Sequence, residues 1–267
     1  MFRNNSYKLS QLRGKLRIIR ELLSQNGIRW VFYYFLLSLL RRSSRALGER
    51  VLDLEIRNDL PGCYSCEWNR AVWRNYNWAQ KGEEWTQSLE WKQSVIDLVL
   101  LKYVEAGKTV LEIGPGAGRW TETLQKMARR LTLVDISDRC IELCKNRFST
   151  CNNIEFFVNE GTNLDFIEDA TVDFIWSWDV FVHLSPQCTK EYISEFSRVL
   201  KKRGRGIIHH PKDAGLHGGW RSRMTAELFS HLLEKYELIP ILQFDSWDSG
   251  GRFGVREFHD TITVFEK

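Results

Sequence analysis

Residues 110–120 read Val-Leu-Glu-Ile-Gly-Pro-Gly-Ala-Gly-Arg-Trp, and this stretch decides the fold. The apolar run 109–113 leads into a turn, and a helix-compatible stretch, 120–130, follows it. Strand, glycine turn and helix in this order let the backbone approach a nucleotide-like ligand at a helix N-terminus. Glycine suits such a turn because it tolerates positive φ and has no side chain to block the ligand. The turn has glycines at alternate positions, Gly114, Gly116 and Gly118.

The glycine spacing differs from that of dinucleotide-binding proteins. Their G-x-G-x-x-G fingerprint places a third glycine five residues after the first, but Arg119 occupies that position here. Glu112 fits poorly beside a pyrophosphate and suits a ligand that carries positive charge. S-adenosylmethionine has a sulfonium and an ammonium group and no phosphate. The pattern Glu-x-Gly-x-Gly-x-Gly resembles the first motif of the class I S-adenosylmethionine-dependent methyltransferases.

An acid follows the next apolar run at the distance expected for a ribose contact. Asp135 lies 21 residues after Gly114, where the acid at the end of a second strand meets ribose hydroxyls in such folds. The alternative is that Asp135 caps a helix over 137–148. That alternative is weaker because Ser137 and Asp138 already suit the capping position.

Two later segments complete the cofactor site that the resemblance implies. After a strand over 154–158, the family places an acid or amide on the adenine amino group, and Glu160 is the candidate. A strand over 172–178 leads into a polar and aromatic segment that looks like the family's fourth motif, at the strand ends where ligands bind. The expected contacts with S-adenosyl-L-methionine are Glu112, Gly114, Gly116, Gly118, Asp135, Ile136, Glu160, Gly161, Trp178 and Asp179.

Strand-like and helix-like stretches alternate along residues 85–267, which predicts an α/β fold with a doubly wound, mostly parallel sheet. The resemblance implies the seven-stranded, Rossmann-like methyltransferase sheet, with a final hairpin and one antiparallel strand at the sheet edge. A helix over 189–200 is expected to end in the basic run 201–203 with Gly204 beyond it. Strands are expected at 109–113, 131–135, 154–158, 172–178, 205–209, 238–244 and 258–266.

The chain is long enough for one domain with its own core and an N-terminal extension. Of its 267 residues, 43% are apolar and 27% are charged, which is a globular composition. Residues 1–50 hold 11 Lys or Arg and 2 Asp or Glu, so of the net charge of +4 they carry +9 and the remainder −5. We expect a basic helical extension over 1–60 and a methyltransferase domain over 61–267, beginning with a tryptophan-rich lid over 61–92. No nucleic-acid partner is expected, because the basic excess belongs to the extension.

Two interpretations of the extension remain open. Apolar residues recur at helical spacing at Leu9, Leu12, Leu16, Ile19 and Leu23, which predicts an amphipathic basic helix. The apolar run 30–40 reaches about 16 Å as a helix, too short for roughly 30 Å of hydrocarbon. Arginines also stand where a signal-peptide cleavage site would be. The extension either binds anionic lipid at the membrane surface or packs on the domain or on the second subunit of a homodimer.

Aromatic residues concentrate just before the glycine turn. Five tryptophans lie within 68–91; flat apolar faces beside polar groups suit sugars, although most of these rings are expected in the core. The loop 209–223 follows the fifth strand, and its arginines suit an anionic or hydroxylated acceptor. The expected acceptor contacts are Trp85, Trp220, Arg221 and Arg223.

Methyl transfer is an in-line displacement at a sulfonium carbon, so the protein supplies alignment and a base for the acceptor's proton. His183 is the first candidate because it follows the fourth strand and its ordinary pKa is near neutrality. His209 and His210 come next, and alternation along the fifth strand lets at most one of them face the site. Asp179 is expected to orient the base or bind the acceptor.

These features predict a cytoplasmic or peripheral-membrane O-methyltransferase for a sugar or glycolipid hydroxyl, which releases S-adenosyl-L-homocysteine and resembles enzymes of bacterial surface-glycan and glycolipid pathways. The alternatives are a methyltransferase for a small aromatic or lipid-quinone acceptor, a non-catalytic nucleotide-binding module, and a nicotinamide-dependent reductase, against which Arg119 argues. The six cysteines predict reduced thiols in a chain this long. The pairs Cys63/Cys66 and Cys140/Cys144 are not expected to bind a metal.

Overall fold

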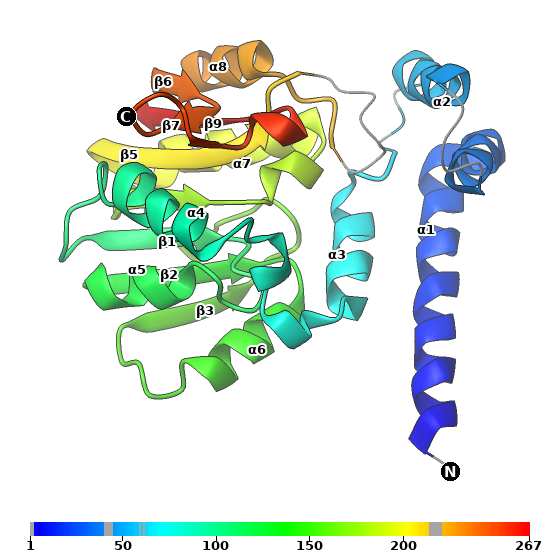
Figure 1. Ribbon diagram of the computed structural model, residues 1–267, viewed down its shortest axis with the longest axis horizontal. Helices are drawn as coiled ribbons and strands as arrows, with labels where there is room; N and C mark the ends of the chain where they lie inside the picture. The colour runs from blue at the N-terminus through cyan, green and yellow to red at the C-terminus, as the bar shows by residue number, and fades with distance from the viewer. Residues whose placement is uncertain (1–2, 40–44, 59, 61, 214–220) are drawn as a thin grey trace.

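The computed structural model describes residues 3–39, 45–58, 60, 62–213 and 221–267, and it has a sheet domain flanked by N-terminal helices (Figure 1). The helices are α1 (Arg3–Leu39), α2 (Arg45–Arg57), α3 (Cys66–Asn75), α4 (Leu89–Ser94), α5 (Thr121–Met127), α6 (Asp138–Arg147), α7 (Pro186–Val199) and α8 (Ala226–Lys235). Single turns are η1 (Trp78–Gln80), η2 (Glu83–Trp85), η3 (Val95–Leu100), η4 (Phe181–His183) and η5 (Arg256–Phe258). The strands are β1 (Thr109–Ile113), β2 (Arg130–Asp135), β3 (Ile154–Val158), β4 (Val172–Ser177), β5 (Leu200–Pro211), β6 (Ile239–Phe244), β7 (Ser246–Trp247), β8 (Phe253–Gly254) and β9 (Asp260–Glu266).

The central sheet has seven strands in the order β3-β2-β1-β4-β5-β9-β6. Its first five strands pair in parallel, and β9 runs antiparallel to both β5 and β6. The expected doubly wound, mostly parallel fold class is therefore confirmed. The expectation that the antiparallel strand lies at the edge was wrong, since β9 is inside the sheet and β6 forms the edge. Pro240 in β6 explains this order, because proline lacks a backbone donor and is tolerated in an edge strand.

Helices cover both faces of the sheet, and their arrangement leaves room for a ligand at one end. The turns and helices α4, η3, α5 and α6 pack on one face through Val95, Leu124 and Phe148. On the other face, α7 and α8 pack through Phe196 and Phe229. The strand order reverses between β1 and β4, and the carboxyl ends of strands at such a switch point border a crevice.

The basic run 201–203 begins a strand and does not end a helix, so that part of the sequence prediction was wrong. Helix α7 ends at Val199, and β5 starts at the fully buried Leu200. Lys201 forms an ion pair with Asp173 at 2.8 Å on the neighbouring strand. Lys201 therefore neutralises an acid beside the sheet instead of the carbonyls of a helix C-terminus.

The N-terminal helices pack on each other and on α3. Leu22, Trp30, Val51 and Trp68 are buried in a small core that these three helices share. Trp30 Nε1 also donates a hydrogen bond to Glu55 Oε1 at 2.9 Å. Because this core joins residues on both sides of position 60, a domain boundary there stays a prediction. Within the described part of the chain, no helix is both long enough and apolar enough to cross a membrane.

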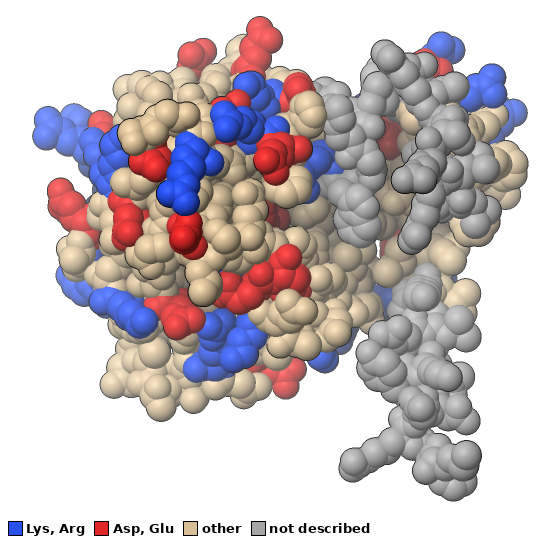
Figure 2. Space-filling view, viewed as in Figure 1, with Lys and Arg blue, Asp and Glu red and all other residues tan. Residues whose placement is uncertain are grey.

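Charged side chains of both signs are mixed on the face of the sheet domain that Figure 2 displays. Several exposed charges of the sheet domain are paired, including Arg130 with Glu155 at 2.7 Å and Arg252 with Glu90 at 2.8 Å. Mixed signs agree with the small negative charge of the sequence beyond residue 50. Exposed pairs of this kind contribute little to stability, and they keep this face free of a strong field of one sign.

Candidate active site

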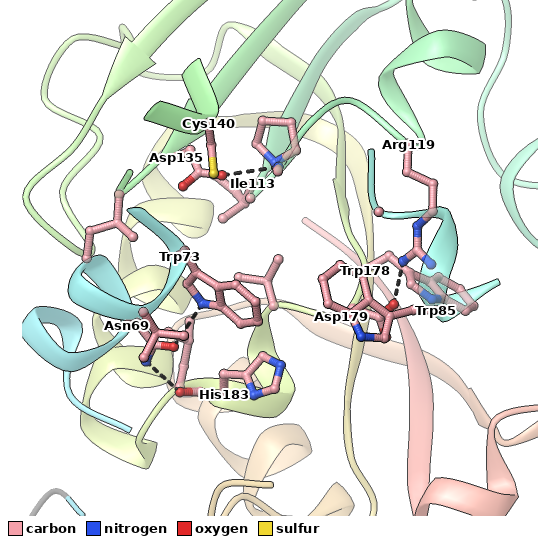
Figure 3. Close-up of a pocket in the computed structure, with 18 of the residues that line it drawn as sticks. Asn69, Trp73, Trp85, Ile113, Arg119, Asp135, Cys140, Trp178, Asp179 and His183 are labelled. Carbon is pink, nitrogen blue, oxygen red and sulfur yellow. Dashed lines mark hydrogen bonds and ion pairs between the residues drawn. The ribbon is translucent and has the colours of Figure 1, made fainter. Parts of the chain in front are cut away.

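A cavity of about 670 Å³ opens at the carboxyl ends of β1, β2 and β4 and is covered by α3 and the segment 76–85. Figure 3 shows Asp135 and Ile113 on one side of it, Trp73 and His183 on a second, and Arg119 with Asp179 on a third. The segments that meet here are far apart in sequence. The switch point of the sheet therefore carries the largest concentration of the predicted site residues.

The glycine turn forms the floor of this cavity. Gly114 has φ 69°, and a Cβ there would lie 2.3 Å from Val180. Gly116 has φ 57°, and a Cβ there would lie 2.7 Å from the Trp78 ring. Gly118 is different, because its Cβ would meet Phe148 at 2.5 Å and it does not line the cavity. The first two glycines keep the floor open, and the third allows the turn to pack on the residue after α6.

Asp135 is a buried carboxylate at the edge of the floor. Its Oδ2 accepts a hydrogen bond from Gly116 N at 3.2 Å, and its Oδ1 accepts one from Ser137 N at 2.9 Å. Burial raises the pKa of Asp135 to about 7, although these backbone donors oppose the shift. Ser137 is the N-cap of α6, so Asp135 does not have the alternative role of capping this helix. Ile136 lines the cavity next to the carboxylate.

Glu112 lies behind the glycine turn and not in the cavity wall. Its Oε2 accepts a hydrogen bond from Thr121 Oγ1 at 2.6 Å in a fully buried position. Burial raises the pKa of Glu112 to about 8, and the nearby Asp135 adds to the shift. A buried pair of carboxyl groups favours a ligand that brings positive charge to this end of the cavity.

The segment after β3 places an amide, not the predicted acid, inside the protein. Glu160 is exposed and does not line the cavity. Asn159 is buried, and its Nδ2 donates to the hydroxyl of the cavity residue Tyr192 at 2.9 Å. Asn159 Oδ1 is buried and has no hydrogen-bond partner among the described residues. The sequence allowed an acid or an amide here, and the prediction named Glu160, whereas the neighbouring Asn159 is the buried residue. Gly161 lines the cavity as expected.

Charges alternate along the wall that begins with Asp179. Its carboxylate pairs with the Arg119 guanidinium and lies 3.1 Å from His209 Nδ1. His209 Nε2 in turn lies 3.2 Å from Asp260, which pairs with Arg221 at 2.9 Å. Burial opposes ionisation of Asp179, but Arg119 and His209 hold its pKa well below the usual range. Burial also opposes protonation of His209, but the two carboxylates raise its pKa above the ordinary value.

Among the three candidate bases, His183 lines the cavity. Its ring centroid lies 5.2 Å from that of Trp73, and its carbonyl oxygen accepts from Asn69 Nδ2 at 2.8 Å (Figure 3). His209 is buried beneath the wall, between two carboxylates. His210 faces the other side of β5, where its ring stacks on Phe229 at 3.9 Å and burial lowers its pKa to about 3. His210 is therefore a packing residue, and its selection as a candidate base was wrong.

Aromatic rings of the segment 73–85 form one side of the cavity. Trp73, Tyr76, Trp78 and Trp85 all line it, with neighbouring ring centroids 5.0–6.0 Å apart. The other two tryptophans of 68–91 are buried in the cores of the protein. Of these four rings, only Trp85 was among the acceptor contacts predicted from the sequence. The dense aromatic stretch signalled the lid, but it did not identify which rings face inward.

The predicted acceptor residues that follow β5 do not all lie at the cavity. Arg221 lines the cavity, and its Nε and Nη2 both bind Asp260. Arg223 does not line it, and its Nη2 donates to Leu60 O at 3.3 Å. That prediction was wrong because the side chain ties the loop to the N-terminal part of the chain. Trp220 lies outside the described residues.

Arg119 also lines the cavity. In the sequence it served only as evidence against a dinucleotide ligand. It is 5% exposed, and its Nη1 has no hydrogen-bond partner among the described residues. Such a buried cationic donor fits a ligand with a carboxylate. Among the described residues, no cluster of His, Cys, Asp and Glu has the arrangement of a metal site.

Comparison with known proteins agrees with this geometry. Residues 110–204 match the family described as a methyltransferase domain. Over 129 residues the chain is 29% identical to the demethylmenaquinone methyltransferase of Tropheryma whipplei (strain Twist), a match that covers 47% of this chain and 51% of that protein. Over 102 residues it is 32% identical to phosphoethanolamine N-methyltransferase 1 of Caenorhabditis elegans, covering 38% and 21%. The chain thus spans about half or less of the length of these curated relatives.

The fold is similar to that of a TehB-like S-adenosylmethionine-dependent methyltransferase from Corynebacterium glutamicum ATCC 13032 Kitasato. The TM-score is 0.52, with 22% identity over 73% of this chain and 94% of that one. The matched segment 110–204 contains the glycine turn, Asp135 and Asp179. This segment is similar to methyltransferase domains, and the sheet has the fold of an S-adenosylmethionine-dependent methyltransferase. The predicted cofactor, S-adenosyl-L-methionine with S-adenosyl-L-homocysteine as product, is confirmed.

Proposed function

We propose that the protein is an S-adenosylmethionine-dependent O-methyltransferase for a hydroxyl group of a sugar or glycolipid. The observation that carries this proposal is one continuous cavity with two chemically different ends. One end has the glycine floor and the buried Asp135. The other has stacked aromatic rings beside His183. A cofactor and a flat, hydroxyl-bearing acceptor would meet between these ends.

The cofactor end supports a specific set of roles. Asp135 would accept hydrogen bonds from the ribose hydroxyls, and Ile136 would pack on adenine. The carbonyl oxygen of the Asn159 side chain, which is buried near Tyr192, would accept from the adenine amino group. Arg119 would bind the carboxylate of the methionine moiety through its Nη1. Glu112 behind the turn would stabilise the ammonium group by charge.

The acceptor end supports proton removal by His183. When bound, the cofactor supplies an activated methyl group on a sulfonium centre. The protein must align the acceptor oxygen with that methyl group and accept its proton. Asn69 Nδ2 donates a hydrogen bond to the backbone carbonyl oxygen of His183, and Asn69 Oδ1 accepts one from Trp73 Nε1 at 3.1 Å. This shared support fixes the base relative to the ring on which an acceptor would stack. Asp179 would orient the wall through Arg119 and His209.

Calorimetry tests the cofactor half of the proposal. S-adenosylhomocysteine should bind and NAD(H) should not, because Arg119 occupies the position that a pyrophosphate fingerprint needs for glycine. The acceptor half is tested by incubating the protein with cofactor labelled in its methyl group and a cell-envelope extract. A labelled carbohydrate-containing product supports the proposal, and a labelled product without sugar contradicts it.

A second candidate acceptor is a lipid quinone or a small aromatic compound. The four lid rings, which contact one another mostly edge to face, and Phe258 favour it, because they form an apolar wall of the cavity. The similarity to a demethylmenaquinone methyltransferase also favours it. A soluble demethylquinone analogue and a sugar acceptor can be compared directly in the same assay. Transfer of label to the quinone alone would replace the glycan proposal.

Substitution of His183 by glutamine tests the base. Turnover should fall by about 10²–10⁴-fold, whereas the affinity for S-adenosylhomocysteine should stay near that of the unmodified protein. His231 on α8, which is exposed and does not line the cavity, provides the control. Full activity of His183→Gln would remove this residue from the mechanism.

We further propose that α1 binds the anionic surface of the cytoplasmic membrane. Its described part leaves several large apolar side chains exposed, with Phe32 at 59% and Phe35 at 60%. Helix α1 is kinked at Gly27; the exposed Arg29 lies on the same segment as these rings, and the exposed Arg17 and Arg20 lie on the segment before the kink. Basic residues beside apolar ones favour anionic lipid. The full chain should float with vesicles that contain phosphatidylserine and less well after Phe32→Glu. Dimerisation without vesicle binding would instead assign this face to a second copy of the chain.

A further inference from the structure

Two cysteines from distant parts of the sequence lie in contact behind the cavity wall. Cys66 begins α3 and Cys188 lies in the first turn of α7, and their Sγ atoms are 3.1 Å apart. The starts of the two helices are also joined by a hydrogen bond from Ser185 N to Tyr64 O at 3.1 Å. A disulfide needs sulfur atoms about 2.05 Å apart. The two sulfur atoms therefore need to approach by only about 1 Å.

The surroundings of the pair favour a reactive thiolate at one of the two positions. The hydrogen bond from Cys66 lowers the pKa of Cys188 to about 7, although burial opposes the shift. The Ser185 hydroxyl helps to lower it, whereas Glu191 and Glu67 act in the opposite direction. The helix N-terminus adds further stabilisation of negative charge. Cys66 correspondingly holds its proton, and its pKa is raised.

We propose that Cys66 and Cys188 form a reversible disulfide when the protein meets a hydroperoxide, and that this bond locks α3 onto α7. The Cys188 thiolate attacks the peroxide oxygen, the O–O bond breaks, and a sulfenic acid and an alcohol or water form. Cys66 then attacks the sulfenic sulfur, its proton leaves with the hydroxyl group as water, and the S–S bond closes. Overall, two thiols lose two electrons and two protons, and one hydroperoxide is reduced.

The bond would act on the cavity because α3 forms part of its wall. Asn69 and Trp73 both belong to α3 and line the cavity. On the other side, a Cβ added to the cavity residue Gly161 would lie 2.8 Å from Cys66 Sγ. A covalent tie at the start of α3 holds the lid in its closed position and slows exchange of a bound nucleoside. This last consequence rests on the proposed function, whereas formation of the bond does not.

Thiol counting and peptide mapping of the full chain test the bond itself. Treatment with hydrogen peroxide should remove two of the six free thiols, and a peptide containing Cys66 should be found linked to one containing Cys188. Cys66→Ser and Cys188→Ser should each abolish that link. Cys151→Ser is the matched control, because Cys151 is half-buried and lies beside Gln125, away from the cavity. Peroxide treatment that leaves the two thiols free, or links other cysteines instead, would overturn the proposal.

Hydrogen exchange tests the lock without any ligand. Amides of α3 should exchange about tenfold more slowly in the oxidised protein than in the reduced protein, and dithiothreitol should restore the faster rate. Release of S-adenosylhomocysteine should slow by a similar factor. Unchanged exchange in α3 despite a formed disulfide would refute the lock. Failure of the reduced protein to bind S-adenosylhomocysteine would instead contradict the proposed function, and the exchange measurement would still decide the lock.

Discussion

Replacing Asp135 by asparagine should stabilise the ligand-free protein at neutral pH while it weakens the binding of S-adenosylhomocysteine. The side chain is 7% exposed and accepts hydrogen bonds from Gly116 N and Ser137 N. Burial raises its pKa from the ordinary value of 3.8 to about 7. The folded protein therefore binds this proton more tightly than the unfolded chain does. An amide of the same shape removes the cost of ionising a buried carboxyl group.

The size of the effect follows from the shift. About three pKa units at about 1.4 kcal/mol each correspond to about 4 kcal/mol of stability. This stability is fully present below the unfolded pKa of about 4 and is lost as the pH rises through the folded pKa near 7. Asparagine keeps one acceptor oxygen, so it loses a hydrogen bond worth about 1 kcal/mol at every pH. The net gain at pH 8 is therefore about 3 kcal/mol.

Urea unfolding at two pH values measures the stability change. The difference in free energy of unfolding between Asp135→Asn and the unmodified protein should grow by about 4 kcal/mol between pH 4 and pH 8. Calorimetry at pH 8 should show binding of S-adenosylhomocysteine weakened by about 100-fold. That factor corresponds to loss of about 3 kcal/mol from charge-assisted hydrogen bonds to two ribose hydroxyls.

The two measurements test the raised pKa of Asp135 and its contact with the ribose separately. A difference in stability that does not change with pH would show that the carboxyl group is not penalised by burial. Unchanged affinity for S-adenosylhomocysteine would show that Asp135 does not bind the ribose. Asp138→Asn is the matched control, because Asp138 is exposed on α6 and outside the cavity.

Three further predictions use the same site. Gly116→Ala should weaken binding of S-adenosylhomocysteine, because the added Cβ would displace Trp78 in the cavity. Gly118→Ala should instead lower the free energy of unfolding by about 1–3 kcal/mol, because its Cβ would meet Phe148. Calorimetry and urea unfolding should therefore rank the two variants in opposite order. His209→Asn should cost about 3–5 kcal/mol near pH 6, because it removes a cationic partner from both Asp179 and Asp260 and leaves each with one arginine. That cost should shrink as the pH rises through the raised folded pKa of His209, and a cost independent of pH would contradict a charged His209. Binding of S-adenosylhomocysteine at pH 7 should release up to one proton, because its ammonium group favours ionised Glu112, whose pKa is about 8. Calorimetry in buffers of different ionisation enthalpy measures this release, and Glu112→Gln should reduce it.

Local sequence patterns were sufficient for the sheet and for the glycine turn and buried acid at one end of the cavity. The glycines at 114 and 116 need positive φ, and Asp135 ends a buried strand. Such signals depend on backbone conformation and burial over a few neighbouring residues, which a single sequence records. The start of β5 was missed because a basic run followed by glycine has the same local composition as a helix C-terminus.

Choices between neighbouring residues were less predictable. Glu160 and Asn159 both satisfied the expected chemistry, and only the packing of Tyr192 against the amide separates them. Arg221 and Arg223 are two residues apart, yet one lines the cavity and the other binds Leu60 O. A shift of one position reverses the direction of a side chain in an extended strand, and Arg221 and Arg223 lie in an irregular segment where no fixed period holds. Composition alone does not record that direction.

The sequence by itself determined the kind of ligand at the cofactor end, because the turn geometry, the missing third fingerprint glycine and the acid at 135 are local features. Tertiary structure alone decided which distant groups act together. Arg119 meets Asp179, His209 lies between Asp179 and Asp260, and Cys66 touches Cys188 across 122 positions of sequence. These contacts arise where the strand order reverses and the lid helix closes over the sheet, so they depend on packing between elements that no local pattern encodes.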